Sequence, residues 1–314
     1  MRKLRRVMLI TLAIIVAIPL LFLATTATVN AVATNAEAAE ITSYGQLVPV
    51  DGKHMNVVVS GQGSETIVLM PGLGTAAPGL DFQPLIQELA AQYRVIAVEP
   101  FGTGLSDQTG TARTGSNIAR EVHEALQYLE IDRYVLMGHS MAGIYALTYS
   151  ATYPDEVRAF VGIDTSVPKQ PGWNERVPTD AIAVLKDLGI TRVLTSITGD
   201  PYAGGPYDEK TRRQLNLLTT KNAAAPTLLN EVDNAPTNFE AVSGMTFPKD
   251  LPVLLFVRTK NIDVEGWVDL HQRQAASVDK SRMITIDGEH YLHRTHSPLI
   301  TQATSSFLNT LSSR

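Results

Sequence analysis

Residues 134–143 read Tyr-Val-Leu-Met-Gly-His-Ser-Met-Ala-Gly, an apolar run followed by a serine with small residues on either side. The run Tyr134–Gly138 predicts a short buried strand, and Ile144–Thr152 predicts a helix that begins almost at once. A sharp turn between strand and helix lifts Ser140 above the edge of a sheet, where small neighbours accommodate its strained backbone. We therefore expect Ser140 to be a nucleophile.

Short apolar runs alternate with helical patterns on both sides of this stretch. Leu47–Val50 and Met55–Ser60 predict an antiparallel hairpin, and the alternation from Thr66 onward predicts parallel strands joined by helices. The further expected strands are 66–70, 94–99, 134–138, 158–163, 253–257 and 283–286. Between them, residues 118–129 predict an amphipathic helix with Ser116 as its N-cap. The fold class is therefore α/β, with a mostly parallel central sheet and helices on both faces.

The alternation stops between Pro168 and Asp250, a stretch too long for a simple loop. Helical patches near Thr179–Leu188 and Lys210–Leu218 indicate that it has its own structure, and we expect a helical cap insertion. The expected division is an N-terminal signal or anchor segment with its linker at 1–40, a core at 41–167 and 251–314, and the cap at 168–250.

The N-terminus has the pattern of an export signal. Basic residues at positions 2, 3, 5 and 6 precede an apolar run from Val7 to Ala24, and an Ala-rich linker follows. Such a basic segment stays in the cytoplasm, so we expect the folded domain outside. Ala36-Glu37-Ala38 offers a cleavage site, but the run approaches the length that spans a bilayer. We favour an uncleaved anchor on the outer face of the cell membrane, and a cleaved, secreted form stays open.

Composition excludes several classes of function. The net charge is -5, and no basic run follows the N-terminus, so we expect no nucleic-acid partner. The absence of cysteine excludes disulfides, a thiol nucleophile and thiolate metal ligands.

Gly138-His-Ser140-Met-Ala142 resembles the Gly-x-Ser-x-Gly elbow of the α/β-hydrolase superfamily, with Ala142 in place of the last glycine. The resemblance covers about Gln46–Leu311 and includes the strand order, the elbow, a late histidine and the cap. It implies acyl transfer through Ser140, without a metal ion or an organic cofactor.

The base in this superfamily is a histidine that follows the last strand. His290 fits, because residues 287–293 resemble the family's Gly-x-Gly-His-Phe stretch with Glu289 in place of the second glycine. His293 and His296 compete for this role. The spacing of the three histidines matches no zinc motif, so we expect no metal site.

The resemblance also implies two backbone N–H donors for the oxyanion, those of Leu73 and Met141. Residues 70–74 resemble the family's His-Gly-x loop with Pro71 in place of histidine. The loop 99–107 resembles the family's Asp-x-x-Gly-x-Gly-x-Ser loop, and we expect it to be structural.

The acid of the triad has more than one candidate. Counting from Pro252 to the position usual in the superfamily reaches Asn261, so Asp263 is our first choice and Glu265 a third. The other known arrangement takes the acid from the end of the preceding strand, where Asp164 lies. The triad is defined by geometry, so these alternatives stay open.

These residues predict a serine hydrolase that cleaves a carboxylic ester, with lipid-like substrates suited to a membrane tether. One alternative is an aminopeptidase of the proline iminopeptidase kind, which needs cap carboxylates to hold the substrate's ammonium group. The candidates for that role are Glu175, Asp180, Glu231 and Glu240. The other alternative is a non-catalytic surface binding module on the same fold.

Overall fold

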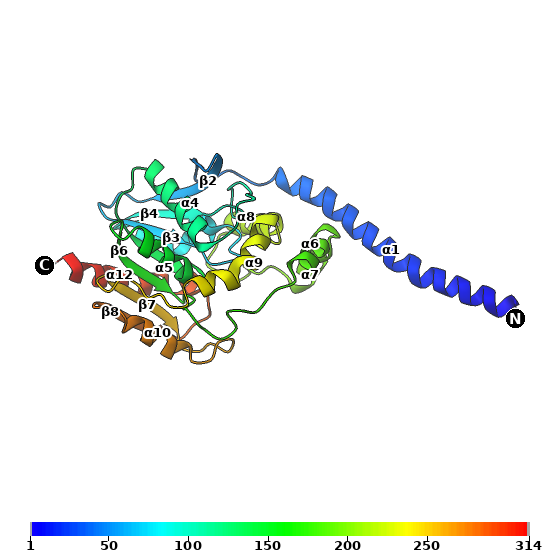
Figure 1. Cartoon of the computed structure of the whole chain (residues 1–314). Helices are drawn as coiled ribbons and strands as arrows, with labels where there is room; N and C mark the ends of the chain where they lie inside the picture. The colour runs from blue at the N-terminus through cyan, green and yellow to red at the C-terminus, as the bar shows by residue number, and fades with distance from the viewer. Residues whose placement is uncertain (1, 313–314) are drawn as a thin grey trace.

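The computed structural model of the chain describes residues 2–312. Its centre is an eight-stranded sheet in the order β1-β2-β4-β3-β5-β6-β7-β8 (Figure 1). The strands are β1 (Gln46–Val50), β2 (Lys53–Ser60), β3 (Thr66–Met70), β4 (Arg94–Glu99), β5 (Tyr134–His139), β6 (Val157–Ile163), β7 (Val253–Arg258) and β8 (Ser281–Ile286).

The sheet is parallel except at one edge. β1 pairs with β2, and β2 with β4, in antiparallel fashion, whereas β3 to β8 pair in parallel. The α/β fold class predicted from the sequence is confirmed. Because the carboxyl ends of parallel strands meet at one edge, the loops after β3, β5, β6 and β8 are brought together there.

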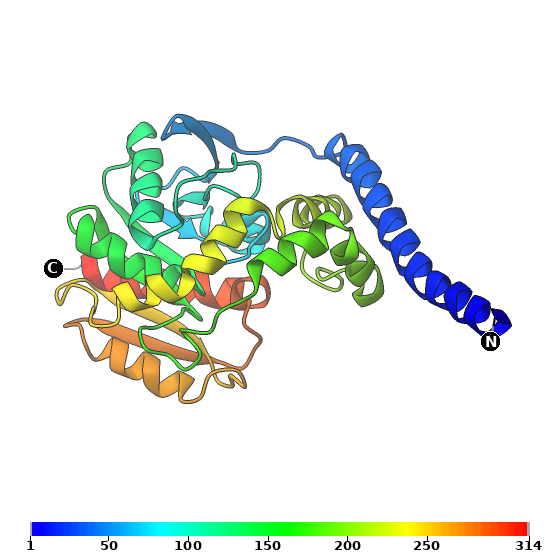
Figure 2. The same cartoon turned by 45° about the vertical axis from the view of Figure 1, so that its right-hand side comes forward.

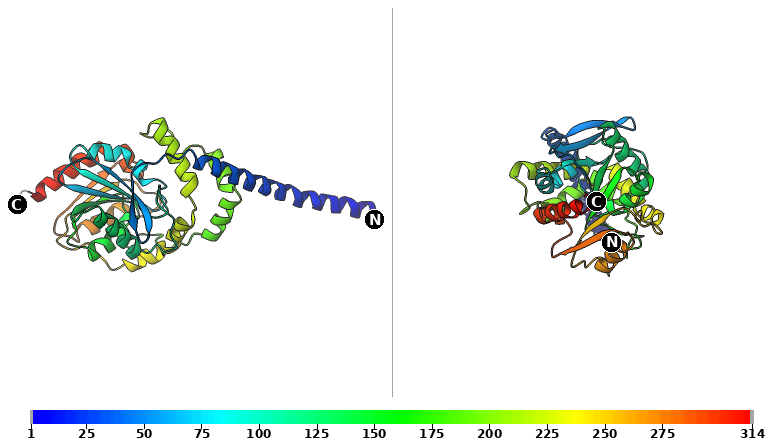
Figure 3. Two further views of the ribbon diagram at one scale, coloured as in Figure 1. Left: turned by 90° about the horizontal axis from the view of Figure 1, so that it is seen from above. Right: turned by 90° about the vertical axis from the view of Figure 1, so that its left-hand side faces the viewer.

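Helices cover both faces of the sheet (Figure 3). One face carries α3 (Gln83–Leu89) and α12 (Ser297–Ser312), and the other carries α4 (Gly115–Tyr128), α5 (Ala142–Thr152) and α10 (Trp267–Ala275). The short helices α2 (Pro78–Asp81) and α11 (Leu292–Thr295) lie in the loops at the carboxyl edge. The apolar β strands are buried on both faces, which explains why their sequences do not alternate.

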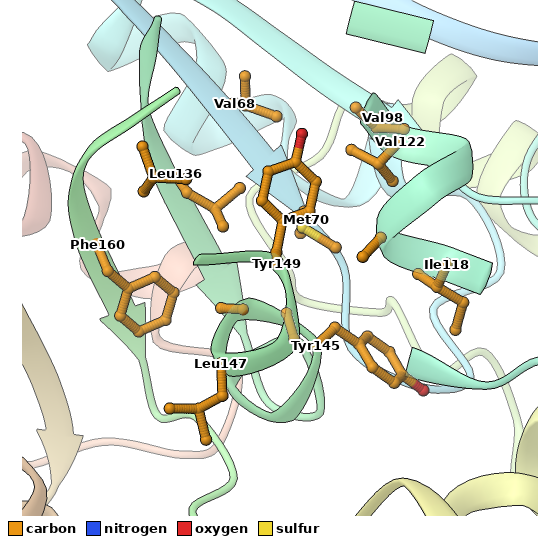
Figure 4. Packing of buried hydrophobic residues seen from close by; sticks show 14 of the residues in the cluster. Val68, Met70, Val98, Ile118, Val122, Leu136, Tyr145, Leu147, Tyr149 and Phe160 are labelled. Carbon is orange, nitrogen blue, oxygen red and sulfur yellow. The ribbon is translucent and has the colours of Figure 1, made fainter. Parts of the chain in front are cut away.

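Figure 4 shows how α4 and α5 pack on the sheet. Ile118 and Val122 of α4 and Tyr145 of α5 lie in one buried cluster with Met70 and Leu136 of the strands. This packing fixes the start of α5, and therefore the turn that carries the serine.

The N-cap of α4 is Thr114, two residues before the expected Ser116. The hydroxyl of Thr114 accepts a hydrogen bond from the backbone N–H of Asn117 at 3.2 Å, and Ser116 lies inside the first turn. Both hydroxyl residues suit a cap, and the structure uses the one with extended backbone.

Four helices lie between β6 and β7: α6 (Thr179–Asp187), α7 (Ile190–Thr198), α8 (Glu209–Asn222) and α9 (Pro226–Ala241). Helix α8 contacts the loops after β3 and β4, where the side-chain amide of Asn222 donates to the carbonyl oxygens of Ala76 at 2.9 Å and Gly104 at 3.0 Å. All four lie inside the stretch 168–250, and the division into core and cap stays a prediction.

The N-terminal helix α1 (Arg2–Ala38) projects from the rest of the protein (Figures 1 and 2). Within residues 2–312 it is the one helix long and apolar enough to cross a membrane. The stretch after Ala24, which we expected to be a linker, continues the helix to Ala38. Alanine has the highest helix propensity, which is compatible with this extension.

Candidate active site

Ser140 occupies the turn between β5 and α5 with a φ of 55°, in the left-handed region that non-glycine residues rarely adopt. Its N–H donates to the carbonyl oxygen of Ile163 at 3.3 Å. A Cβ atom on Gly138 would lie 2.8 Å from the Cβ of Ala142. The alanine at the last position of the elbow is therefore accommodated because Gly138 has no side chain.

The loop after β3 approaches the serine closely. A Cβ atom on Gly72 would lie 2.7 Å from the Cβ of Ser140 and 3.2 Å from its Oγ. Next to this contact, the backbone N–H groups of Leu73 and Met141 donate no hydrogen bond within the described part of the chain. Met141 directly follows the serine and Leu73 directly follows Gly72, so both expected oxyanion donors belong to residues next to this contact, with their protons uncommitted.

His290 lies in the loop between β8 and α11, on the same edge of the sheet. Its Nδ1 is 2.6 Å from Oδ2 of Asp164. Its carbonyl oxygen accepts a hydrogen bond from Nε2 of His139 at 3.1 Å, and the two rings lie 4.5 Å apart. His139 precedes Ser140, so this contact holds the loop of His290 beside the elbow. With Nδ1 engaged, Nε2 is the nitrogen left to accept a proton.

Asp164 follows β6 and is fully buried, with a φ of 46°. Its Oδ1 accepts hydrogen bonds from the indole Nε1–H of Trp267 at 2.7 Å and from the backbone N–H of Arg258 at 3.1 Å. The guanidinium Nε of Arg258 is 3.1 Å from Oδ2. A buried carboxylate needs hydrogen-bond donors, and the two that hold Oδ1 leave Oδ2 for the contact with His290.

The structure does not bring Asp263 to the histidine. Its side chain is 72% exposed and lies 3.7 Å from a guanidinium nitrogen of Arg258. The side-chain oxygen of Asn261 accepts from the backbone N–H groups of Asp263 and Val264, which closes the loop on itself. Glu265 is also exposed. The geometry therefore favours Asp164 over our first choice, Asp263.

The two other candidate bases have different partners. The ring Nε2 of the buried His293 is 2.7 Å from Oδ2 of Asp81, and the Nε of Arg294 donates to Oδ1 of Asp81 at 2.9 Å. Burial alone would raise the pKa of Asp81, but these two partners outweigh it and lower the pKa. His296 contacts the hydroxyl of its neighbour Thr295. Neither ring is paired with Asp164.

Comparison with known proteins identifies the fold. A family model described as alpha/beta hydrolase fold matches residues 65–193, which include the elbow. The crystal structure of an epoxide hydrolase from Vigna radiata matches with a TM-score of 0.67 and 17% sequence identity, covering 85% of this chain and 98% of that chain. The chain is an α/β-hydrolase-fold protein.

Two curated proteins match this chain over part of their length. Uncharacterized protein YbdG of Bacillus subtilis (strain 168) is 30% identical over 173 residues, which are 53% of this chain and 53% of that protein. A 2-hydroxy-6-oxononadienedioate/2-hydroxy-6-oxononatrienedioate hydrolase of Paraburkholderia phymatum is 36% identical over 134 residues, 41% of this chain and 46% of that protein. The chain thus matches about half the length of these relatives.

The loop after β4 is a structural feature of this α/β-hydrolase fold. The carboxylate of the buried Glu99 accepts hydrogen bonds from Tyr44, Asn56 and the backbone N–H groups of Gly79 and Leu105. Burial raises the pKa of Glu99, against the lowering effect of these donors. The sequence resemblance indicated a structural role for this loop, and its contacts agree with that role.

No metal-binding cluster of three or more His, Asp or Glu side chains is found in residues 2–312. Among the carboxylates weighed for an aminopeptidase, Glu175, Asp180 and Glu240 are exposed. Glu231 is buried and accepts a hydrogen bond from the hydroxyl of Tyr145 at 2.7 Å.

Proposed function

We propose that the protein is a serine hydrolase that cleaves a carboxylic ester through an acyl-enzyme intermediate on Ser140. The observation that carries the proposal is the 2.6 Å contact between Nδ1 of His290 and the buried carboxylate of Asp164, next to the elbow. A carboxylate in this position selects the tautomer in which Nε2 is free to act as base, and it stabilises the imidazolium ion that forms.

In the proposed reaction, Nε2 of His290 accepts the hydroxyl proton of Ser140 as Oγ attacks the ester carbonyl carbon. The N–H groups of Leu73 and Met141 stabilise the negative charge that develops on the carbonyl oxygen. The imidazolium ion then protonates the leaving alcohol, which leaves an acyl-enzyme. A water molecule then attacks the acyl carbon while His290 accepts its proton. The imidazolium ion returns this proton to Oγ as the bond to Ser140 breaks, which releases the carboxylic acid and free Ser140.

The surroundings of the site favour an ester over an aminoacyl substrate. An aminopeptidase needs a carboxylate free to bind the substrate's ammonium group, and the hydrogen bond to Tyr145 engages Glu231. Burial also raises the pKa of Glu231, which disfavours its charged form. The other carboxylates considered for binding the ammonium group, Glu175, Asp180 and Glu240, are exposed to solvent.

We further propose that α1 stays attached as a membrane anchor, with the catalytic domain on the extracellular face. The predicted cleavage site Ala36-Glu37-Ala38 lies inside α1, and the carboxylate of Glu37 pairs with the guanidinium of Arg192 at 2.5 Å. Helical, docked backbone is a poor protease substrate, because cleavage requires local opening. An anchored enzyme would meet esters that partition into the membrane.

The test is hydrolysis by the purified full-length chain in detergent micelles. The substrates are p-nitrophenyl esters from acetyl to lauroyl and the p-nitroanilides of proline and alanine. We expect wild type to hydrolyse the esters and Ser140→Ala to be inactive. The control variant Ser306→Ala, which removes an exposed serine of α12, should keep the wild-type activity. Faster turnover of the anilides would favour the aminopeptidase. A folded wild-type protein that hydrolyses neither the esters nor the anilides would favour the non-catalytic binding module.

A further inference from the structure

Helices α6 and α7 expose large apolar side chains to solvent. On α7, Ile190, Val193, Leu194 and Ile197 recur at the spacing of a single helix face. Leu194 and Ile197 are 54% and 76% exposed. The exposed large apolar residues of the two helices, here called the apolar hairpin surface, are Val184, Leu185, Leu194 and Ile197. Isolated apolar residues on a surface are common, but a group of four on one helical hairpin calls for a partner.

The turn between α6 and α7 is packed against α1 (Figure 2). A Cβ atom on Gly189, in this turn, would lie 2.4 Å from the carbonyl oxygen of Thr26 and 2.9 Å from the Cβ of Asn30. The side-chain amide of Asn30 donates to the carbonyl oxygen of Lys186 at 3.1 Å. The close approach of the two backbones requires the glycine.

An ion pair holds α7 to α1 closer to the C-terminal end of α1. The guanidinium group of Arg192 contacts both carboxylate oxygens of Glu37, at 2.5 Å and 2.9 Å, and its Nε donates to Oδ1 of Asn30 at 3.2 Å. Both charged side chains are about three-quarters buried. A two-pronged contact of this kind restrains orientation as well as distance, so the hairpin is held at a defined height along α1.

The apolar run of α1 gives that height relative to a membrane. A helix needs about 20 residues to cross the hydrocarbon core, at a rise of about 1.5 Å per residue. A span that begins at Val7, directly after the basic residues, therefore ends near Thr26. Thr26 is the residue that Gly189 touches. If α1 spans the membrane, the α6–α7 hairpin consequently lies where α1 leaves the bilayer.

We propose that the apolar hairpin surface docks into the interfacial region of the same bilayer that α1 crosses. The chain supplies both parts of this interface: α1 spans the membrane, and the exposed side chains of α6 and α7 lie beside its exit point. Exposed apolar side chains gain free energy by entering the boundary between headgroups and acyl chains. The inference rests on the proposed anchoring by α1 and is independent of the proposed ester hydrolysis.

This docking would also orient the protein. Two points of attachment, the span and the hairpin, restrict rotation of the catalytic domain about α1. Helices α8 and α9, which follow the hairpin and contact the loops after β3 and β4, would be held close to the membrane. Lipid-like substrates would then reach the site from the bilayer side.

The experiment uses single cysteines, for which the chain offers a clean background because it has no cysteine of its own. Ile197→Cys is labelled with an environment-sensitive fluorophore in the full-length protein, which is reconstituted in phosphatidylcholine–phosphatidylglycerol vesicles. Thr195→Cys is the matched control, exposed on the other side of α7. Asp155→Cys, in the loop before β6, is the distant control at the opposite edge of the sheet. Each sample is measured with and without lipids that carry a spin label near the headgroup.

We expect the spin-labelled lipids to quench the fluorophore at position 197 about twofold or more, to quench position 195 less, and to leave position 155 unchanged. Protein that co-floats with vesicles but shows equal quenching at positions 197 and 155 would overturn the docking and leave the anchor intact. A blue-shifted emission at position 197 without lipid quenching would overturn it in favour of a second copy of the chain. Failure to co-float would overturn docking and anchoring together, and ester hydrolysis would be unaffected by any of these results.

Discussion

Asp164→Asn should lower kcat by about 10⁴-fold, whereas Asp263→Asn should change it by no more than about twofold. In the first variant an amide replaces the carboxylate whose Oδ2 lies 2.6 Å from Nδ1 of His290. An amide that presents its NH₂ group to Nδ1 stabilises the wrong tautomer, with the proton on Nε2, and cannot neutralise an imidazolium ion. A 10⁴-fold loss corresponds to about 5.5 kcal/mol of transition-state stabilisation.

The contacts of the two carboxylates explain the difference in size. Asp164 is fully buried and accepts from Trp267 and from the backbone of Arg258 as well as contacting His290. Asp263 is 72% exposed, and its 3.7 Å contact with Arg258 is a solvated ion pair, a kind worth about 0–1 kcal/mol. Removing that contact should affect neither the histidine nor the serine.

The assay is steady-state hydrolysis of the best ester from the substrate panel, with kcat and KM determined separately. The loss in Asp164→Asn should fall on kcat, because the carboxylate acts on the charge that develops at His290 and does not bind the substrate. Near-UV circular dichroism and the urea midpoint establish that each variant is folded. A large loss in Asp263→Asn together with a small one in folded Asp164→Asn would refute the assignment.

Two further predictions concern the elbow. Gly72→Ala should reduce kcat by about 10²-fold, because the added Cβ would lie 2.7 Å from the Cβ of Ser140 and displace either the nucleophile or the N–H of Leu73. An unchanged kcat in ester hydrolysis would contradict the close approach of this loop to the serine. Burial, followed by the nearby histidine charges, lowers the pKa of His139 well below its usual value, so unfolding takes up a proton below about pH 6.5. The stability that comes from keeping this ring neutral is present above that pH and is lost as the pH falls. The loss is at most about 1.4 kcal/mol per pH unit. Between about pH 7 and pH 5.5, the urea midpoint of wild type should therefore fall more than the urea midpoint of His139→Gln. Equal falls in the two proteins would show that His139 does not contribute.

The elbow was predictable because its signal is local. The apolar strand, the serine and the small residues Gly138 and Ala142 are contiguous, and each has a direct physical reason in the turn. The strand bounds agree with the prediction to within two residues, because buried parallel strands are short, apolar and bounded by polar loops.

The acid of the triad was less predictable because its position depends on the path of a loop. Counting along the chain from Pro252 assumes that the turn after β7 points inward, but the backbone contacts of Asn261 close this loop on itself. A local signal for Asp164 did exist, since it directly follows a buried strand next to β5, and its charge there needs a partner. Sequence alone does not reveal that this partner is His290, 126 residues away.

The inserted helices and α1 also show the limits of periodicity. α9 was missed because Pro226 and Pro236 interrupt the helical pattern, and α7 because its β-branched residues favour strands. The contact between Glu37 and Arg192 joins residues 155 positions apart, so no local sequence pattern predicts it.

The most direct measurement of the central claim is covalent labelling of the full-length protein with a fluorophosphonate, followed by mass spectrometry of the peptides. We expect one adduct on Ser140, no adduct in Ser140→Ala, and labelling slowed by orders of magnitude in His290→Gln, because the hydroxyl then has no base. Ser306→Ala should be labelled at the wild-type rate. A folded wild-type protein that takes up no label, or takes it up on a residue other than Ser140, would contradict the proposal that this chain is a serine hydrolase.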